Sequence, residues 1–504
     1  MENTDRDNKW LTIQQRKRAY EKAIDEQLTG KERNAYLLLV MLLAVVYYIF
    51  FNNRRAGISL FVFLAMVLWV FFYINKNSIN IKNKTGLFAL ACLLVICIGN
   101  LLHCNSVAEE LNRVAVPMLI TGAFIMFRYP DTRWGDWSFI GMVLERIVII
   151  PFRYISKPFQ IIRYTKHSTA SMDKSKSSSI LKGLLIGIPT LLVVMVLLSS
   201  ADVMYGYYLS NLGRFIRIEN AGDVVRPAIS IQVLFILFFS YLYSFKYNAN
   251  DSCVRKAKAA RYDRVMCITL LVPLVVAYAG FIAIQLYYLF GREGLPNGFT
   301  YAEYARQGFF QLLIVTAINF VITSLIASSY RKAGAKLDML LKVLLSIIAL
   351  CTFFMLYSSS YKLSLYEQGY GFTYLRFYVH CFIIMLFLLM GIMLAGIWFP
   401  RIDIVKSCFI CAIGFYCLLT LVSPDRFIAE QNLRRYEVTG KIDTEYMERL
   451  SADAVPYVRE YLEDKGDSQL NGLRTWIYDQ ERKAEEYKWY EMNLPLYKLS
   501  KANN

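Results

Sequence analysis

The sequence predicts an all-α fold: a polytopic transmembrane helical bundle of about eleven spans with a small C-terminal helical soluble domain. Of the 504 residues, 56% are hydrophobic and only 19% are charged, which is too apolar for a soluble globule of this length. Apolar stretches of roughly 18 to 22 residues also recur, each bounded by charge. This is the length that crosses the hydrocarbon core of a bilayer as a helix.

The first apolar run follows 33 mostly polar residues and has no small-residue cleavage site behind it. We therefore expect a retained helix rather than a signal peptide. The expected spans are 35–51, 58–75, 85–102, 112–127, 182–200, 227–245, 265–290, 308–329, 338–357, 376–398 and 404–422.

The distribution of basic residues predicts the orientation of these spans. The N-terminal segment and the even-numbered connections hold 33 of the 56 Lys and Arg residues, whereas the odd-numbered connections hold 10. Because basic residues are retained on the cytoplasmic side, we expect the N-terminus inside and the C-terminus outside a bacterial cytoplasmic membrane. Arg54 and Arg55 are an exception, because they fall in the first outward connection.

Changes in composition divide the chain into segments. Pro151 and Pro158 interrupt a basic, apolar stretch, which we expect to form a broken helix in the inner interface. A Ser/Lys-rich linker follows at 167–179. The expected segments are a polar cytoplasmic N-terminus (1–33), a four-helix membrane unit (34–127), a basic interfacial connection with its linker (128–181), a seven-helix membrane unit (182–422) and an extracytoplasmic helical tail (423–504).

The tail carries signals for short packed helices. Ser423 before Pro424 indicates the start of a helix, Gly440 indicates its end, and Asp443 and Ser451 can each begin another. Its apolar residues, among them Trp476 and Trp489, are expected to be buried. About 80 residues form only a marginal core of their own, so we expect the tail to dock on the membrane helices.

Several classes of function are disfavoured. The net charge of +17 lies mainly at membrane boundaries, where it serves orientation and contact with anionic lipid head groups on the cytoplasmic side, so no nucleic-acid partner is expected. His103, His167 and His380 form no metal-binding pair, and Cys408 and Cys411 lie in an apolar span. No catalytic, cofactor or metal motif is recognised, so we expect neither a cofactor nor an enzyme.

Several motifs follow one another from residue 199 onward. They are SSAD at 199–202, QLYYLFG at 285–291, TYAEYARQGFF at 300–310, LYEQGYGFTYLR at 365–376, SPDRFIAEQNLRRYEVTGKIDTEYMERLSADAVP at 423–456 and WYEMNL at 489–494. Together they resemble the bacterial membrane proteins called domain of unknown function 4173, with relatives in family 4153. The resemblance implies a multi-pass envelope protein and supplies no catalytic residues.

Placed on the expected topology, these motifs all fall on the outer side, where irregular, polar backbone is expected to form a cap over the helix ends. Charged residues at a membrane boundary are candidates for function. The candidate outer-face cluster is Asp202, Gln285, Glu303, Arg306, Glu367, Arg376 and His380, with Gln285 and Asn319 deeper in the bundle. The simpler interpretation of Glu303 is structural rather than functional: Thr300 and Glu303 form a capping box at the start of a helix.

The leading hypothesis is a non-enzymatic envelope protein that binds, senses or scaffolds at the outer face, where its partner is an envelope protein or a small ligand. The alternative is a transporter or carrier of a small or lipid-linked substrate. Pro189 and Pro273 interrupt two spans, which keeps this alternative open, although no inverted repeat is visible. An intramembrane enzyme is the third class.

Overall fold

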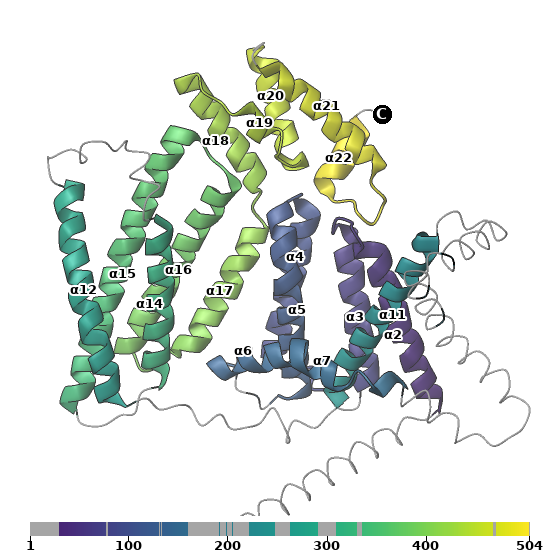
Figure 1. Ribbon diagram of the computed structural model, residues 1–504, viewed down its shortest axis with the longest axis horizontal. Coiled ribbons are helices and arrows are strands. Elements are labelled where there is room, and N and C mark those ends of the chain that lie inside the picture. Colours follow the sequence, from purple (N-terminus) through teal and green to yellow (C-terminus); the bar gives the residue numbers. More distant parts are fainter. Residues whose placement is uncertain are drawn as a thin grey trace, which may run out of the picture. The chain divides into compact units, whose positions relative to one another are not determined.

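The computed structural model describes an all-α chain with no β-strand among its described residues (Figure 1). Several stretches of the chain fall outside the description. The described residues are 30–76, 79–130, 132, 134–159, 191, 198, 204, 221–246, 263–290, 309–329, 335–466 and 470–502.

Nine described helices are long and apolar enough to cross a membrane, or ten if the bent pair α17–α18 counts as one span. Ten of the eleven expected spans coincide with described helices. The remaining one, the fifth span at 182–200, lies almost entirely outside the described residues. The fold is therefore a polytopic helical bundle, as predicted. The helices that match expected spans are α2 (Gly30–Phe51), α3 (Ile58–Asn75), α4 (Lys84–Leu102), α5 (Ser106–Arg128), α11 (Ala221–Tyr243), α12 (Arg264–Phe290), α14 (Phe309–Ser329), α15 (Ala335–Tyr370), α16 (Tyr374–Trp398) and α17 (Ile404–Thr420).

One helix is longer than its sequence suggested. The ninth span was expected at 338–357, but α15 continues to Tyr370 and so includes the first part of the LYEQGYGFTYLR motif. The expected irregular, polar backbone of the motif is reduced to the short turn between α15 and α16. The reason is local: the stretch that follows residue 357 holds no proline, and no glycine before Gly369, so nothing ends the helix earlier.

Contacts divide the chain into two compact units, and the helices α4 and α5 contribute residues to both. The segments expected from composition stay a prediction. Unit 1 comprises residues 1–87, 117–131 and 142–251, and unit 2 comprises residues 88–116, 132–141 and 252–504.

In unit 1, aromatic side chains pack α2, α3, α5 and α11 together. The Tyr36 hydroxyl is buried in α2 and donates to the Phe239 carbonyl of α11 over 3.0 Å. Phe71 of α3 stacks on Phe124 of α5, with ring centroids 3.6 Å apart. Side chains of this size remove large apolar areas from solvent and fix how the helices pack.

In the basic stretch with two prolines, the helix continues through Pro151 after a π-helical turn, and the expected interfacial location of this stretch stays a prediction. It consists of α6 (Trp137–Leu144), a π-helical turn η1 (Glu145–Ile149) and α7 (Ile150–Arg153). Apolar Val148, Ile149 and Phe152 are more than half exposed, which suits a helix lying in the membrane interface. Arg146 is instead buried, where it donates to the Ser244 carbonyl and lies over the Phe245 ring of η2 (Ser244–Lys246).

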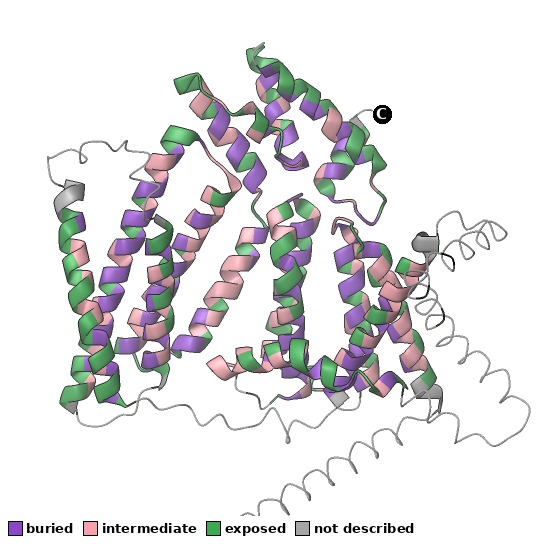
Figure 2. Ribbon diagram, viewed as in Figure 1, coloured by how far each residue is buried: buried purple, intermediate pink, exposed green. Residues whose placement is uncertain are grey.

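In unit 2, α15 packs against α12, α14 and α16, and α16 packs against α17. Buried and exposed faces alternate around these helices, and the outward faces of α12 and α14 are largely apolar (Figure 2). Glycine permits the closest contacts. A Cβ atom added at Gly99 of α4 would lie 2.4 Å from the Thr420 carbonyl oxygen of α17.

The tail follows α17 and consists of short polar helices at one end of the unit 2 bundle (Figure 1). Its core contains Ile428, Leu433, Val455 and Leu473, which are all fully buried. Cys104 of the α4–α5 connection packs on the same core, as do the partly buried Phe372 of the α15–α16 turn and Phe377 of α16. The tail elements are α18 (Pro424–Thr439), α19 (Thr444–Met447), η4 (Ala452–Ala454), α20 (Val455–Lys465), α21 (Asn471–Glu486) and α22 (Leu494–Ala502).

The two ends of the unit 2 bundle agree with the count of basic residues. The α4–α5 connection, the α15–α16 turn and the segment after α17, which the count places on one side, all contact the tail. Arg264 and Asp338 pair over 2.7 Å at the opposite end, where Lys406 also lies 4.9 Å from the ring of Trp134. Arg264 and Trp134 belong to connections that the count places on the other side, and Asp338 and Lys406 lie at the starts of the spans that follow two further such connections. Which end faces the cytoplasm stays a prediction.

Candidate functional site

The tail helices begin and end at the residues that the sequence indicated. The Ser423, Asp443 and Ser451 side chains accept hydrogen bonds from the backbone amides of Arg426, Tyr446 and Asp453. Gly440 ends α18 with a φ of 65°, in the left-handed region that glycine adopts without strain. These caps fix the path of the chain across the ends of the membrane helices, so that its polar side chains face the helix connections.

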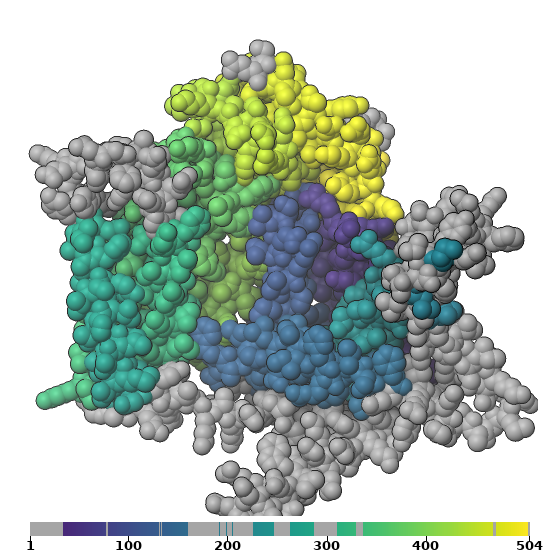
Figure 3. Space-filling model, in the orientation of Figure 1, coloured from purple at the N-terminus to yellow at the C-terminus, as the bar shows by residue number. Residues whose placement is uncertain are grey.

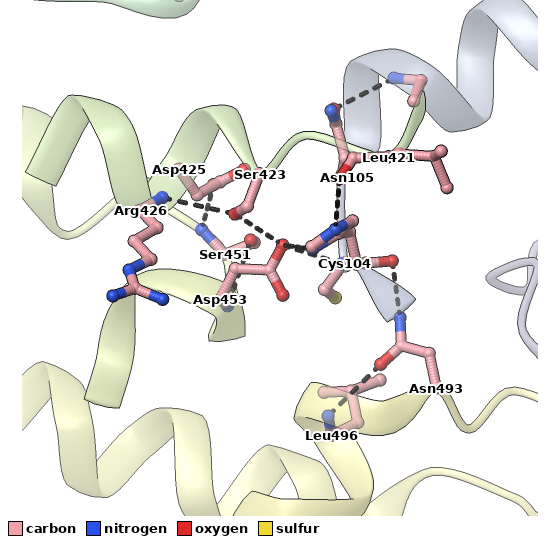
Figure 4. Close-up of polar contacts among 12 residues, drawn as sticks. Cys104, Asn105, Leu421, Ser423, Asp425, Arg426, Ser451, Asp453, Asn493 and Leu496 are labelled. Atoms are coloured by element: carbon pink, nitrogen blue, oxygen red, sulfur yellow. Dashed lines mark hydrogen bonds and ion pairs between the residues drawn. The ribbon is translucent and has the colours of Figure 1, made fainter. Parts of the chain in front are cut away.

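Asp453 is the centre of the first contact between the tail and the membrane helices (Figure 4). Its Oδ2 accepts from the Cys104 amide over 3.1 Å and from the Ser423 hydroxyl over 2.9 Å. Asn493 belongs to the same contact, because its Nδ2 donates to the His103 carbonyl over 3.2 Å. The α4–α5 connection is therefore bound through its backbone as well as its side chains.

His103 completes this network as a titratable group. Its Nε2 lies 3.0 Å from the Leu421 carbonyl oxygen and its Nδ1 lies 3.5 Å from Asp453 Oδ2, so both ring nitrogens face acceptors. The hydrogen bond with Asp453 is the main cause that raises the pKa of His103, against the opposing effect of burial. The charged imidazolium, which donates from both nitrogens, is the form that fits this site.

A second contact joins α18 to the turn between α15 and α16. The Asn432 side chain accepts from the Phe372 amide over 2.7 Å and donates to the Phe372 carbonyl over 2.9 Å. Arg435 donates to the carbonyls of Gln368 and Gly369 over 3.0 and 2.8 Å. These carbonyls lie in the last turn of α15, where no helical partner exists, so α18 caps that helix.

Asp425 makes the third contact and is completely buried. Its Oδ1 accepts from the Ser451 amide over 2.6 Å and from the Tyr374 hydroxyl at the start of α16. Its Oδ2 is buried and has no hydrogen-bond partner among the described residues. Burial raises the pKa of Asp425, while the hydrogen bonds from Tyr374 and Ser451 lower it.

Two members of the predicted outer-face cluster meet directly. Glu367 of α15 is 4% exposed, and its Oε2 lies 3.0 Å from Nε2 of His380 on α16. Its Oε1 is buried and has no hydrogen-bond partner among the described residues. Arg376 lies at the same turn, where it donates to the Gly371 carbonyl and covers the Tyr366 ring at 4.2 Å. Arg376 therefore supports the turn rather than pairing with Glu367.

Gln285 of α12 is buried elsewhere, deeper in the bundle, as the sequence suggested. It accepts a 2.7 Å hydrogen bond from Ser358, which precedes Glu367 by nine residues, or about 13 Å along the helix. The remaining members of the cluster, Asp202, Glu303 and Arg306, lie outside the described residues, as does the proposed cap at Thr300. The predicted cluster is thus reduced to one described pair, one supporting arginine and one deeper amide.

The described residues offer little for a metal or a nucleophile. Among them, no group of three or more His, Cys, Asp and Glu side chains could hold a metal ion. Cys408 is buried in α17 as a free thiol. Neither His103 nor His380 is hydrogen-bonded to a serine, threonine or cysteine side chain in the described part of the chain.

Sequence reasoning missed the residues that bind the tail to the helices. Asp453 and Asp425 each stand two residues after a capping serine, in Ser451-Ala452-Asp453 and Ser423-Pro424-Asp425. This repeated spacing was the available signal. Asn432 carried none, because its partner Phe372 lies 60 residues away in the chain.

The fold and this site define a polytopic α-helical membrane protein with a polar helical tail bound to one end of its helices. A family model described as "Domain of unknown function (DUF4153)" matches residues 88–461. The chain belongs to this family. No curated protein and no solved structure matched the chain.

The match corrects the expectation from sequence motifs in two respects. The matching family is 4153, which the motifs suggested as the relative, and membership of family 4173 is not shown. The match also begins at residue 88, well before Ser199, and it ends before Trp489 and Asn493. It therefore includes the α4–α5 connection and the contacts made by Asn432, Asp425 and Asp453.

Proposed function

We propose that this protein is a non-enzymatic binding or scaffold protein of a bacterial cytoplasmic membrane, with its N-terminus inside and its tail on the outer face. One observation carries the proposal: the tail hydrogen-bonds to backbone groups at Cys104, Phe372 and Tyr374. A tail held in this way presents one fixed surface above the helix ends. Fixed surfaces bind partners at a lower entropic cost than mobile ones.

The exposed side of the tail supports a binding role. Val438, Tyr478 and Trp489 are 86%, 62% and 63% exposed, although the tail has a buried core. Exposed aromatic residues on a rigid support are typical of sites that bind other proteins or ligands. The expected partner is an envelope protein or a small ligand at the outer face. Anionic head groups are the expected partner of the basic cytoplasmic connections.

The sidedness is tested first. Reporters fused after Lys84, Ser177 or Arg331 are expected to report cytoplasm, and one fused after Lys465 is expected to report the outside. A cytoplasmic signal from the fusion at Lys465 would place the tail on the wrong side and would remove the proposed outer binding surface.

Binding is tested by photo-crosslinking in living cells, with a photoreactive residue placed at Val438, Tyr478 or Trp489 in turn. We expect a discrete adduct from at least one position. The adduct should weaken in the background Asn432→Ala, which loosens the tail, and persist in Arg434→Ala, which alters an exposed residue of the same helix. Crosslinks to lipid alone would contradict a binding surface fixed by docking. An adduct whose yield is unchanged by Asn432→Ala would contradict it as well.

A carrier of a small or lipid-linked substrate is the second candidate. The observation that favours it is the set of buried polar side chains inside α12, α14 and α15, including Gln285, Asn319 and Thr352. Polar groups at membrane depth are costly and often line a path for a solute or ion.

A further inference from the structure

Buried polar side chains follow α14 and α15 along much of their length, on the faces where these helices pack together, and α12 adds one more. All are at most 9% exposed, and they recur on α15 at helical spacing. The set comprises Gln285, Thr316, Asn319, Thr323, Ser324, Thr352, Ser358, Ser359, Lys362 and Glu367. Apolar side chains are favoured over polar ones at buried positions of a membrane-spanning bundle. So many buried polar groups therefore need a physical explanation.

Hydrogen bonds connect these side chains across helices at two levels. At the first level, the Tyr278 hydroxyl donates to Asn319 Oδ1 over 2.6 Å, and Asn319 Nδ2 donates to Thr352 Oγ1 over 3.1 Å. At the second level, Ser358 donates to Gln285 over 2.7 Å. Thr352 and Ser358 are six residues apart, so about 9 Å of α15 separates the two levels.

Three buried polar atoms in this region have no hydrogen-bond partner among the described residues. They are the hydroxyl oxygens of Ser324 and Ser359 and the Oε1 atom of Glu367. Each side chain is at least nine-tenths buried. An unsatisfied buried polar atom costs about 1–3 kcal/mol, and in native proteins such atoms are usually satisfied by internal water. The three atoms lie at different heights along the bundle, which indicates water at several levels rather than at one.

The row of buried polar side chains has a pair of titratable residues at one end, and an ion pair lies beyond its other end. Glu367 and His380 lie at the end that carries the tail, where the His380 side chain is 27% exposed. Arg264 pairs with Asp338 at the opposite end. Glu367 lies fifteen residues along α15 from Thr352, the partner of Asn319, and Ser324 lies five residues beyond Asn319 on α14. At a rise of about 1.5 Å per residue, the polar groups from Glu367 to Ser324 therefore span about 30 Å, close to the thickness of the hydrocarbon core.

We propose that α12, α14, α15 and α16 enclose a file of water molecules that conducts protons between the Glu367–His380 pair and the opposite end of the bundle. The unpartnered Glu367 oxygen receives a proton at the end that carries the tail and passes it to water beside Ser359. Hydroxyl and amide groups at the two hydrogen-bonded levels orient the waters that relay it to Ser324. Each hop transfers one proton between neighbouring oxygens, and no other bond is made or broken.

The chemistry of the lining favours protons over metal cations. Na⁺ or Ca²⁺ requires several oxygen ligands converging on one point, whereas the unpartnered oxygens here lie at separate levels. Buried carboxylates and histidines in membrane helices are typical of proton relays. The competing explanation is that the polar groups only join the helices to one another by hydrogen bonds. This proposal does not depend on the binding role of the tail.

The test measures proton flux into vesicles that contain the purified full-length chain and a pH-sensitive dye. A potassium gradient with valinomycin supplies the driving voltage. We expect the wild-type chain to acidify the vesicles faster than protein-free vesicles do, and Glu367→Gln and Thr352→Val to return the rate to the protein-free level. Each has a matched control: Glu445→Gln, which alters an exposed carboxylate of the tail, and Thr269→Val, which alters an exposed hydroxyl on α12.

Wild-type flux no greater than that of protein-free vesicles would overturn the proposal. Flux that persists in both Glu367→Gln and Thr352→Val would also overturn it and would leave the polar groups as links between helices. Elution as a single species and an unchanged thermal unfolding midpoint identify variants that fold. If Glu367→Gln does not fold, Thr352→Val, which preserves the shape of the side chain, decides the outcome.

Discussion

Asn432 of the tail forms hydrogen bonds to both backbone polar groups of Phe372, accepting from its amide over 2.7 Å and donating to its carbonyl over 2.9 Å. A single side chain thereby replaces the backbone partners that the turn between α15 and α16 cannot supply for itself. Because Asn432 is only 8% exposed, water does not readily take its place. This contact ties the tail to the membrane helices.

Asn432→Ala is expected to loosen the tail, because it leaves the Phe372 amide and carbonyl without their partner. The loss is expected to be about 2 kcal/mol of docking free energy, the usual cost of unsatisfied buried groups. Limited proteolysis of the detergent-solubilised chain should then cut faster between residues 423 and 456. Arg434→Ala, on the exposed face of α18, should leave the cutting rate unchanged. Equal rates in the two variants would show that Asn432 does not hold the tail.

Gly371→Ala tests the turn from the other side. Gly371 has a φ of 80°, and an added Cβ would lie 2.7 Å from Asn432 Oδ1. The left-handed conformation alone costs an alanine about 1–2 kcal/mol, and the close contact adds to it. Gly369→Ala is the matched control, because nothing lies within 4 Å of its added Cβ. We expect a lower thermal unfolding midpoint for Gly371→Ala only; a matching decrease in Gly369→Ala would contradict this reading of the turn.

Gly99→Ala is expected to separate α4 from α17, because its Cβ would overlap the Thr420 carbonyl, which is backbone and has little room to move. The destabilisation is expected to be about 1–3 kcal/mol, as for other overpacked sites. Gly414→Ala places the same methyl group in open space on α17. The yield of folded protein after detergent extraction should fall for Gly99→Ala and not for Gly414→Ala. Similar yields would mean that α4 and α17 are not in close contact.

The docked tail is expected to be more stable at about pH 6 than at about pH 8.5 because of His103. Its pKa is raised in the folded chain, so the stability it contributes is fully present below the unfolded value near 6.5 and is lost as the pH rises through the raised pKa. Asp453, Asp425 and the Leu421 carbonyl are the groups that affect the titration of His103.

His103→Gln is the control for this pH dependence, because it keeps a hydrogen-bonding side chain and removes the titration. Thermal unfolding midpoints at the two pH values should converge in this variant. A wild-type chain that is equally stable at both values would contradict the assignment of a charged His103 at this site.

The local features of the tail could be predicted from the sequence, and its contacts could not. Ser423, Asp443 and Ser451 cap helices two or three residues away, so the signal and the structure lie in the same stretch. Cys104 and Asp453 are 349 residues apart, and nothing in either stretch indicates the other. Long-range pairing depends on how the helices pack, which local patterns do not specify.

The candidate cluster shows the same limit. Glu367 and His380 lie on either side of one turn, so a boundary rule was enough to select both. Trp489 was expected to be buried but is 63% exposed, because the neighbouring Tyr490, 6% exposed, occupies the buried side of the turn. Apolar character alone does not determine which of two adjacent aromatic residues faces the core.

The central claim is that the tail is bound to the ends of the membrane helices through backbone groups of their connections. Hydrogen exchange at the amides of Cys104, Phe372 and Tyr374 tests it most directly, because these amides donate to Asp453, Asn432 and Tyr446 of the tail. We expect all three amides in the full-length chain to exchange far more slowly than freely exposed loop amides. Exchange at the rate of unstructured peptide at these three positions would show that the tail is not docked.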